Sequence, residues 1–201
     1  MTKDFLERLE LSGCDTLIYG IESGSNKILK LMGKSFTSEI AEWCLRNTYE
    51  ARINVNFNII IGFPQEYKDE FQETADFLKR NIKYASFIAL TMFYCNKNTE
   101  LVDKKEFFNI EIPDDDNGHV FWSTKDKKNT YEERLGRLSV LRNLCEDKSL
   151  WDQNRILNLD TKGKETNPTN PSQQPVEAIT IQVFDKGIDA SPLLSDEDKK
   201  D

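Results

Sequence analysis

The chain has 201 residues, a length that suits one domain with some excess or two small domains. Hydrophobic residues make up 38% of the sequence and charged residues 31%, which is apolar enough to build a core and excludes a wholly disordered chain. Acidic residues outnumber basic residues by 35 to 27, so we expect no nucleic-acid partner, because such proteins bind phosphates through clustered Lys and Arg.

No apolar run approaches the roughly 18 residues that a membrane-spanning helix needs. The first residues, from Met1 to Phe5, do not form the hydrophobic stretch of a signal peptide. We therefore expect a cytoplasmic protein without membrane contacts.

The cysteines are too widely spaced to form a local metal site. Cys14, Cys44, Cys95 and Cys145 lie 30, 51 and 50 positions apart, so neither a CxxC nor a CxxxCxxC pattern occurs. In a chain without an export signal, four reduced thiols are the expected state. The sequence assigns no metal ligand.

In chain order, the first 95 residues alternate between segments of helical and of strand periodicity. The expected helices cover residues 4–11, 26–32, 37–51 and 69–80, and the expected strands cover residues 16–21, 54–61 and 85–94. These strands are too apolar for an open antiparallel sheet. The pattern predicts an α/β fold with a parallel sheet, either open or closed into a barrel.

The pattern loosens after Tyr94. We expect residues 96–159 to form an irregular segment followed by a helical extension. Its helix, over residues 131–145, is expected to turn one stripe to the core: Tyr131, Leu135, Leu138, Leu141 and Cys145. Residues 160–201 are rich in Pro and Asn and end in acidic residues, which predicts a disordered linker and tail with one isolated strand candidate at 178–184.

Polar side chains at the carboxyl ends of the first two strands are candidates for a binding site. Glu22 ends the first strand just before a Ser-Gly-Ser turn, and Asn56 and Asn58 lie on the face of the second strand opposite its apolar residues. Ligands of parallel α/β sheets bind at this end of the strands. A purely structural interpretation stays open, in which Glu22 caps a turn and the asparagines bond to one another or to water.

Two motifs in the correct order resemble those of radical S-adenosylmethionine (radical SAM) enzymes, and most closely members with an N-terminal cobalamin-binding domain. The first motif is Tyr19-Gly20-Ile21-Glu22-Ser23-Gly24-Ser25, preceded by Gly13-Cys14 and followed by Lys34 and Thr37; the second is Ile60-Ile61-Gly62-Phe63-Pro64-Gln65-Glu66. The resemblance covers roughly residues 5–110 and is most specific over residues 13–78.

The resemblance implies a partial (β/α) barrel that holds S-adenosylmethionine against a [4Fe–4S] cluster. Glu22 and Asn58 would contact the ribose hydroxyls, and Lys34 would pair with the methionine carboxylate. Gly62 would let the backbone pass close to the adenine, and Pro64 would fix the turn. The residues that the resemblance implies for cofactor binding are Gly20, Glu22, Ser23, Lys34, Asn58, Gly62, Phe63 and Pro64. No catalytic residue is assigned.

The chain also departs from the family pattern. The CxxxCxxC motif that ligates the cluster is missing, and so is the glycine-rich motif for the amino group of S-adenosylmethionine. The family's GFPGET reads Gly62-Phe63-Pro64-Gln65-Glu66-Tyr67, which loses one glycine and the helix-capping threonine. We expect Asp69 to replace the cap. Cobalamin is a further cofactor that the full-length relatives imply.

These features predict the C-terminal portion of a radical SAM enzyme, which is not self-sufficient as this chain. The full enzyme would cleave S-adenosylmethionine to a 5′-deoxyadenosyl radical, while this portion supplies ribose, adenine and carboxylate contacts and part of the substrate wall. A separate N-terminal half that carries the cluster motif is the expected partner, and the substrate is unknown. Two alternatives stay open: a non-catalytic remnant that acts as an interaction module through its acidic tail, and an unrelated small α/β binding protein.

Overall fold

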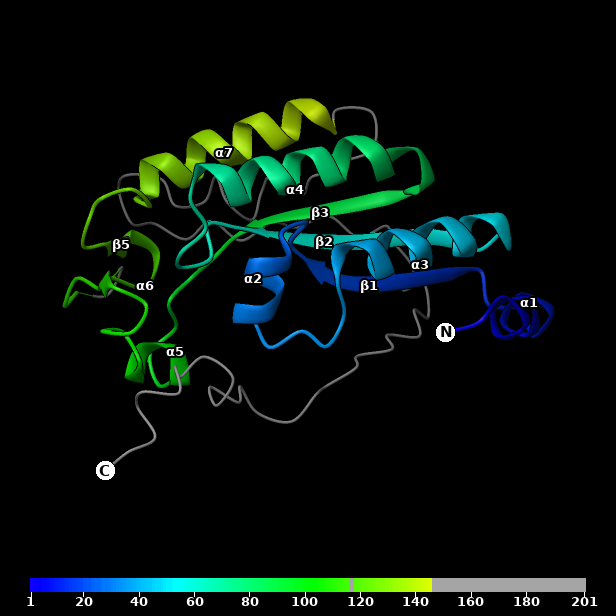
Figure 1. Cartoon of the computed structure of the whole chain (residues 1–201), viewed down its shortest axis with the longest axis horizontal. Helices are drawn as coiled ribbons and strands as arrows, with labels where there is room; N and C mark the ends of the chain where they lie inside the picture. The colour runs from blue at the N-terminus through cyan, green and yellow to red at the C-terminus, as the bar shows by residue number, and fades with distance from the viewer. Residues whose placement is uncertain (116–117, 146–201) are drawn as a thin grey trace, which may run out of the picture.

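The computed structural model describes residues 1–115 and 118–145, which form an α/β fold around a three-stranded parallel sheet. The strands are β1 (Thr16–Glu22), β2 (Asn54–Ile61) and β3 (Phe87–Met92), and β2 lies in the centre. Helices alternate with the strands, as expected for part of a radical SAM barrel (Figure 1). The predicted fold class is confirmed.

The remaining elements are mostly helices. They are α1 (Lys3–Leu11), α2 (Asn26–Leu31), α3 (Ser38–Glu50), α4 (Lys68–Asn81), the 3₁₀ helix η1 (Ile82–Tyr84), α5 (Glu100–Asp103), β4 (Ile110–Glu111), α6 (Gly118–Phe121), β5 (Ser123–Thr124) and α7 (Tyr131–Leu144). Strands β4 and β5 form a small antiparallel pair. This pair and α5 and α6 lie beyond the carboxyl ends of the parallel strands, while α1 lies at the opposite end of the sheet (Figure 1).

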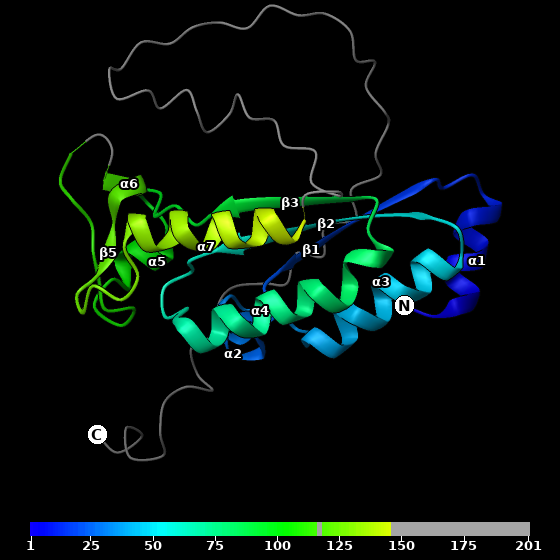
Figure 2. The same ribbon diagram turned by 90° about the horizontal axis from the view of Figure 1, so that it is seen from above.

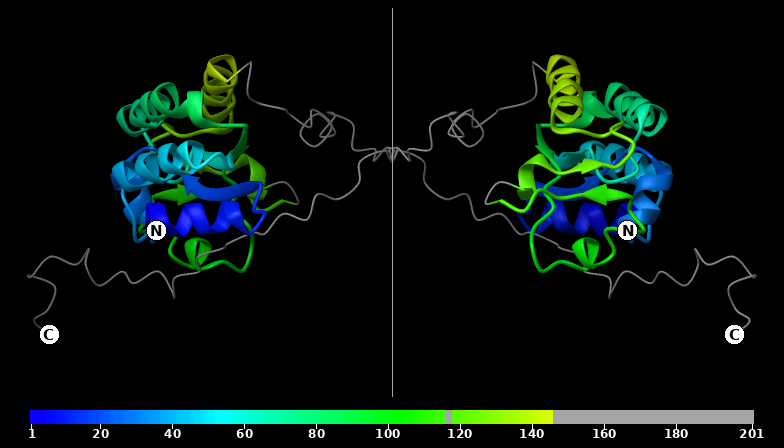
Figure 3. Two further views of the ribbon diagram at one scale, coloured as in Figure 1. Left: turned by 90° about the vertical axis from the view of Figure 1, so that its right-hand side faces the viewer. Right: turned by 90° about the vertical axis from the view of Figure 1, so that its left-hand side faces the viewer.

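Strand β2 shows why one face of the sheet is covered and the other is not. Val55, Phe57, Ile59 and Ile61 are at most 1% exposed, because α3, α4 and α7 pack over their face. Helices α4 and α7 lie together on this side of the sheet when the molecule is seen along its long axis (Figure 3). On the opposite face, the side chains of Asn56 and Asn58 stay half-buried.

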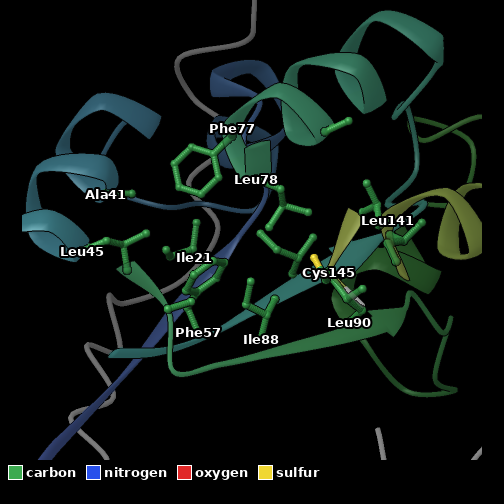
Figure 4. Packing of buried hydrophobic residues seen from close by; sticks show 14 of the residues in the cluster. Ile21, Ala41, Leu45, Phe57, Phe77, Leu78, Ile88, Leu90, Leu141 and Cys145 are labelled. Carbon is green, nitrogen blue, oxygen red and sulfur yellow. The ribbon is translucent and has the colours of Figure 1, made fainter. Parts of the chain in front are cut away.

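The main core fills the space between the covered face and the three helices (Figure 4). Phe57 of β2 meets Phe77 of α4 edge to face, with ring centroids 6.4 Å apart. Leu45 of α3 and Leu141 of α7 complete the layer from either side. Seen from above, α7 runs along β3 and β2, and α4 lies beside it (Figure 2). The core therefore packs α7, the last described helix, against the central strand β2.

Helix α7 begins where expected, but its buried face differs from the predicted one. Arg134 and Arg137 are buried together with Leu138 and Leu141, whereas Leu135 is 38% exposed. The apolar-stripe argument assumed that arginine faces solvent. Here the Nη groups of both guanidinium groups find acceptors inside the protein, although Arg134 Nε has none. The prediction that Leu135 faces the core was wrong.

A second hydrophobic cluster lies at the carboxyl ends of the strands. Trp122 is fully buried and packs with Phe63, Phe108 and Leu101. The indole Nε1 of Trp122 donates to the carbonyl oxygen of Phe93 at 3.1 Å. This cluster holds the segment after β3 against the turn that follows β2.

Some expectations fall outside the described residues. The linker and tail at 160–201, the strand candidate at 178–184 and the end of the extension at 146–159 are among them. Within the described part of the chain, no helix is both long and apolar enough to cross a membrane.

Candidate functional site

Glu22 and Asn58 meet at the carboxyl end of the sheet. The pairing of β1 with β2 shifts register between Gly20 and Glu22, and Glu22 adopts a left-handed φ of 73°. A non-glycine residue in this conformation is strained, and such strain clusters at functional sites. The Glu22 carboxylate accepts a hydrogen bond from Asn58 Nδ2 at 2.7 Å, across the two strands. The side chains of Glu22 and Asn58 therefore converge at this end of the sheet.

Lys34 joins the same cluster from the segment after α2. Its Nζ donates to the carbonyl oxygen of Gly20 at 3.0 Å and lies 3.4 Å from Glu22 Oε1. The Lys34 and Glu22 side chains are 27% and 14% exposed, so the ion pair is accessible from one side only. Lys34 therefore lies at the rim of the group that Glu22 and Asn58 form.

The cluster of Gly20, Glu22, Lys34 and Asn58, which we call the carboxylate cluster, keeps unused bonding capacity. A carboxylate offers about four lone-pair positions, of which Asn58 and Lys34 use one each, and the Lys34 ammonium has a third donor. Gly20 matters because a Cβ there would lie 3.1 Å from Glu22 Oε1 and would crowd the cluster. The donors and acceptors left over suit a vicinal diol and a carboxylate.

Ser23 does not join the carboxylate cluster. Its hydroxyl is fully buried and bonds to the hydroxyl of Thr74 on α4 at 3.1 Å, and it also accepts from the backbone of Ser25. The backbone of Gly24 donates to the same Thr74 hydroxyl. Ser23 thus anchors the loop after β1 to helix α4.

The turn after β2 holds the other predicted residues, Gly62, Phe63 and Pro64. All three are buried, and Phe63 packs edge to face against Phe93 with ring centroids 5.0 Å apart. Gly62 has a φ of 78°, a conformation that strongly favours glycine. The Phe63 side chain therefore belongs to the second hydrophobic cluster.

The two departures from the family turn have different consequences. Gln65, where the family has glycine, adopts a left-handed φ of 68°, so the turn forms at the cost of strain. Helix α4 begins at Lys68, and the Glu70 carboxylate accepts from the backbone N–H of Tyr67 at 2.9 Å. The expectation that Asp69 caps the helix was wrong, because Asp69 lies inside the first turn.

We expect Gln65→Gly to raise the free energy of unfolding by about 0.5–1 kcal/mol, since relief of left-handed strain exceeds the added freedom of the unfolded chain. Arg52→Gly should give a similar gain, because Arg52 is exposed just after α3 with a φ of 64°. Urea unfolding monitored by circular dichroism measures both changes. Gln65→Ala keeps the strain and should show no gain; a gain equal to that of glycine would contradict this explanation.

A set of buried polar residues holds the same turn, and little in the sequence pointed to it. The Glu66 carboxylate accepts from Gly62 N at 2.9 Å and lies 3.2 Å from Arg137 Nη1. Burial raises the pKa of Glu66 to about 7, although Arg137 opposes this shift. Burial lowers the pKa of Arg134 to about 10, so its guanidinium stays charged at neutral pH. The one feature of the sequence that could have indicated this buried set is the pair Arg134 and Arg137, which lie three positions apart on a helix that packs on the core.

The four cysteines lie on separate elements, so they do not fit an iron–sulfur cluster. Cys14 follows α1, Cys44 lies on α3, Cys95 follows β3 and Cys145 ends α7, and all four are free thiols. Burial raises the pKa of Cys95 to about 12, which disfavours the thiolate that binds iron. No group of three or more metal-binding side chains occurs in the described part of the chain.

Comparison with protein families and curated proteins gives a consistent result. Residues 1–78 match the radical SAM superfamily. The chain is 32% identical over 148 residues to a tRNA-2-methylthio-N(6)-dimethylallyladenosine synthase of Thermotoga petrophila, covering 72% of this chain and 27% of that protein. It is 42% identical over 62 residues to a threonylcarbamoyladenosine tRNA methylthiotransferase of Aquifex aeolicus, covering 30% of this chain and 15% of that protein.

A third relative has a less specific name. An uncharacterized methyltransferase of Pyrococcus horikoshii is 34% identical over 82 residues, which are 40% of this chain and 18% of that protein. The chain therefore spans about a quarter or less of the length of these three relatives. The segment that matches the family, residues 1–78, includes the motifs that carry the carboxylate cluster.

Proposed function

This chain belongs to the radical SAM superfamily, and from that membership we propose that it forms part of the barrel wall that binds S-adenosylmethionine in a longer enzyme. The family implies S-adenosylmethionine and a [4Fe–4S] cluster as cofactors. When bound beside a reduced cluster, S-adenosylmethionine supplies a carbon–sulfur bond whose reductive cleavage starts the chemistry. This chain would bind and orient the nucleoside part.

The observation that carries the proposal is the hydrogen bond between Asn58 and Glu22 at the carboxyl end of the sheet. A carboxylate and an amide that lie side by side can accept from and donate to the two hydroxyls of a ribose. Lys34 adds a positive charge at the rim of the cluster, where it would pair with the methionine carboxylate.

The cluster would come from another part of the enzyme, because the cysteines described here are far apart. The free edge of β1 supports this view: among the described residues β1 pairs only with β2, so its outer backbone groups are available to a further strand. An N-terminal half that extends the sheet at this edge and carries the cluster ligands is the partner that we propose. The link to members with a cobalamin-binding domain stays a prediction.

For the whole enzyme we propose a tRNA base as substrate, which replaces the expectation of no nucleic-acid partner. The relatives from Thermotoga petrophila and Aquifex aeolicus both carry tRNA in their names. This chain has a net charge of −8, so we expect the phosphate contacts to come mainly from other parts of the enzyme.

We expect Glu22→Gln to weaken S-adenosylmethionine binding by roughly ten- to a hundredfold. A hydrogen bond to a charged group contributes about 1.5–3 kcal/mol, and the amide keeps the size of the side chain while removing its charge. The isolated chain lacks the iron and amino-group contacts, so its own affinity should be low. NMR titration of the full chain, monitored at the side-chain amide of Asn58, suits such weak binding.

Glu42→Gln is the matched control, because Glu42 also forms an ion pair, with Arg80 at 3.2 Å, but on the outer surface of α3. This variant should bind as the wild-type chain does. Equal affinity of Glu22→Gln and the wild type would contradict the assignment of the site. A wild-type chain that does not respond to S-adenosylmethionine would favour the alternative, a non-catalytic remnant.

A further inference from the structure

We propose that Asn129, Arg134 and Arg137 act as positioning residues for the nucleoside site by fixing the turn that follows β2. We call these three residues the C-terminal clamp, and the turn is residues 62–66. The ligand part of this inference rests on the proposed function above, whereas the effect on the turn does not. None of the three residues belongs to the motifs that identify the family.

Asn129 holds the backbone at the start of the turn. Its Nδ2 lies 3.2 Å from the carbonyl oxygens of both Gly62 and Phe63, although 67 positions separate Asn129 from Gly62 in the sequence. Asn129 is fully buried, and its own backbone N–H donates to the hydroxyl of Thr124. Two carbonyl groups of the turn are thus fixed by one rigid side chain.

Arg137 holds the end of the turn. Its Nη1 donates to the Glu66 carbonyl oxygen at 2.8 Å and lies 3.2 Å from the Glu66 carboxylate. The same carboxylate accepts from Gly62 N, so Glu66 closes the turn on itself while Arg137 binds it to α7. The side chains of Arg137 and Glu66 are 8% and 1% exposed, so water competes little for these bonds.

Arg134 fills the space directly behind Gly62. Its guanidinium stacks on Trp122, with Cζ 4.0 Å from the ring centroid, and donates to the carbonyl oxygens of Val120 and Trp122. Its Nη1 also donates to Asn129 Oδ1 at 3.2 Å, which orients the amide toward the turn. Arg134 therefore sets the position of Asn129 and blocks movement of Gly62 toward α7.

The turn is the continuation of the strand that carries Asn58. Three residues lie between Asn58 and Gly62, and the last of them, Ile61, is paired with Met92 of β3. A displacement of the turn would pull the end of β2, and Asn58 with it, relative to Glu22 on β1. The clamp contacts the turn and not the carboxylate cluster, so it would influence Asn58 and Glu22 through this path.

The test uses Arg137→Lys in the full chain, with three measurements. Lysine keeps the positive charge, but its single nitrogen cannot take the places of both Nη1 and Nη2, which together make three hydrogen bonds in the wild-type chain. Amide hydrogen exchange at Gly62 should become at least tenfold faster, and S-adenosylmethionine should bind roughly five- to tenfold more weakly by the NMR titration. Exchange of core amides in β2, such as that of Phe57, should stay within about twofold of the wild type.

Arg80→Lys is the matched control, since Arg80 pairs with Glu42 on the surface, and it should change none of the three measurements. If Arg137→Lys does not fold, Asn129→Asp replaces it. This variant keeps the acceptor for Arg134 but loses the donor to the Gly62 and Phe63 carbonyls, and should give the same local result.

The outcomes separate this inference from the proposed function. Unchanged exchange at Gly62, or faster exchange at every core amide alike, overturns the clamp. Weaker binding in Glu22→Gln together with unchanged binding in Arg137→Lys overturns the positioning role alone. If Glu22→Gln also binds as the wild type does, the nucleoside site is wrong, and the exchange at Gly62 still decides whether the clamp fixes the turn.

Discussion

Replacing Arg137 by leucine is expected to lower the free energy of unfolding by about 3–5 kcal/mol. The substitution leaves Glu66 buried without its guanidinium partner, so at pH 8 its side chain either carries an uncompensated charge or must take up a proton, and both cost stability. Chemical unfolding in urea, followed by circular dichroism, measures the loss. Arg80→Leu removes a surface ion pair instead and should cost less than about 1 kcal/mol.

The charge of Glu66 can be removed separately. In the double variant Glu66→Gln/Arg137→Leu the amide still accepts from Gly62 N but carries no charge, so we expect it to recover at least half of the lost stability. If the double variant is as unstable as Arg137→Leu, the loss of unfolding free energy arises from packing and not from the unpaired carboxylate of Glu66.

The loss in Arg137→Leu should also depend on pH. Burial already raises the pKa of Glu66 to about 7, so the folded wild-type chain keeps the proton over a pH range in which the unfolded chain has released it. Stability associated with Glu66 is therefore lost as the pH rises from about 4.5 through 7. Removing Arg137 raises this pKa further, so the difference from the wild type should be smaller at pH 5 than at pH 8.

Gly62→Ala should be similarly harmful, with a loss of about 2–5 kcal/mol. A Cβ at Gly62 would lie 2.3 Å from both Cγ and Cδ of Arg134, and the φ of 78° disfavours any side chain. Left-handed strain costs about 1–2 kcal/mol, and forcing an extra group into a packed interior adds about 1–3 kcal/mol. Arg134 cannot move away without breaking its bonds to the carbonyl oxygens of Val120 and Trp122.

Gly13→Ala separates the two contributions. Gly13 has a φ of 88°, but a Cβ there would meet no atom within 4 Å, so only the strain applies. We expect a loss of about 0.5–1 kcal/mol for this control in the same urea experiment, because the reduced freedom of the unfolded chain offsets part of the strain. Equal losses at both glycines would show that the side chain of Arg134 yields, which would argue against a rigid clamp.

The sequence was sufficient for the sheet because burial follows simple periodicity there. The alternation along β2 predicted which face is covered. The placement of Glu22 and Asn58 at the carboxyl ends of neighbouring parallel strands, together with the family resemblance, predicted that they meet. Ser23 was harder to place, because the residue type does not reveal that its hydroxyl turns to Thr74 on α4. A serine in a tight loop is equally compatible with a ligand contact and with a loop anchor.

The residues behind the turn were not predictable in the same way. Arginine is rarely buried, so the apolar pattern of α7 favoured Leu135 over Arg134 for the inward face. Arg134 faces inward because the backbone carbonyl groups of residues 120 and 122 accept its hydrogen bonds, and only the folded chain brings these groups together. Acceptors that are assembled from distant segments leave no local pattern in the sequence.

Because the turn and the C-terminal clamp lie far apart in the sequence, the turn is synthesised well before the residues that hold it. A ribosome that has just completed Gly62 must add 67 more residues before Asn129 exists. At about 5–20 residues per second, this takes roughly 3–13 s, which is far longer than a helix or a small loop needs to form. During that interval β1 and β2 can associate, but the turn lacks its permanent hydrogen-bond donors. The turn, and with it the proposed nucleoside site, is therefore among the last parts of the described chain to reach its final geometry.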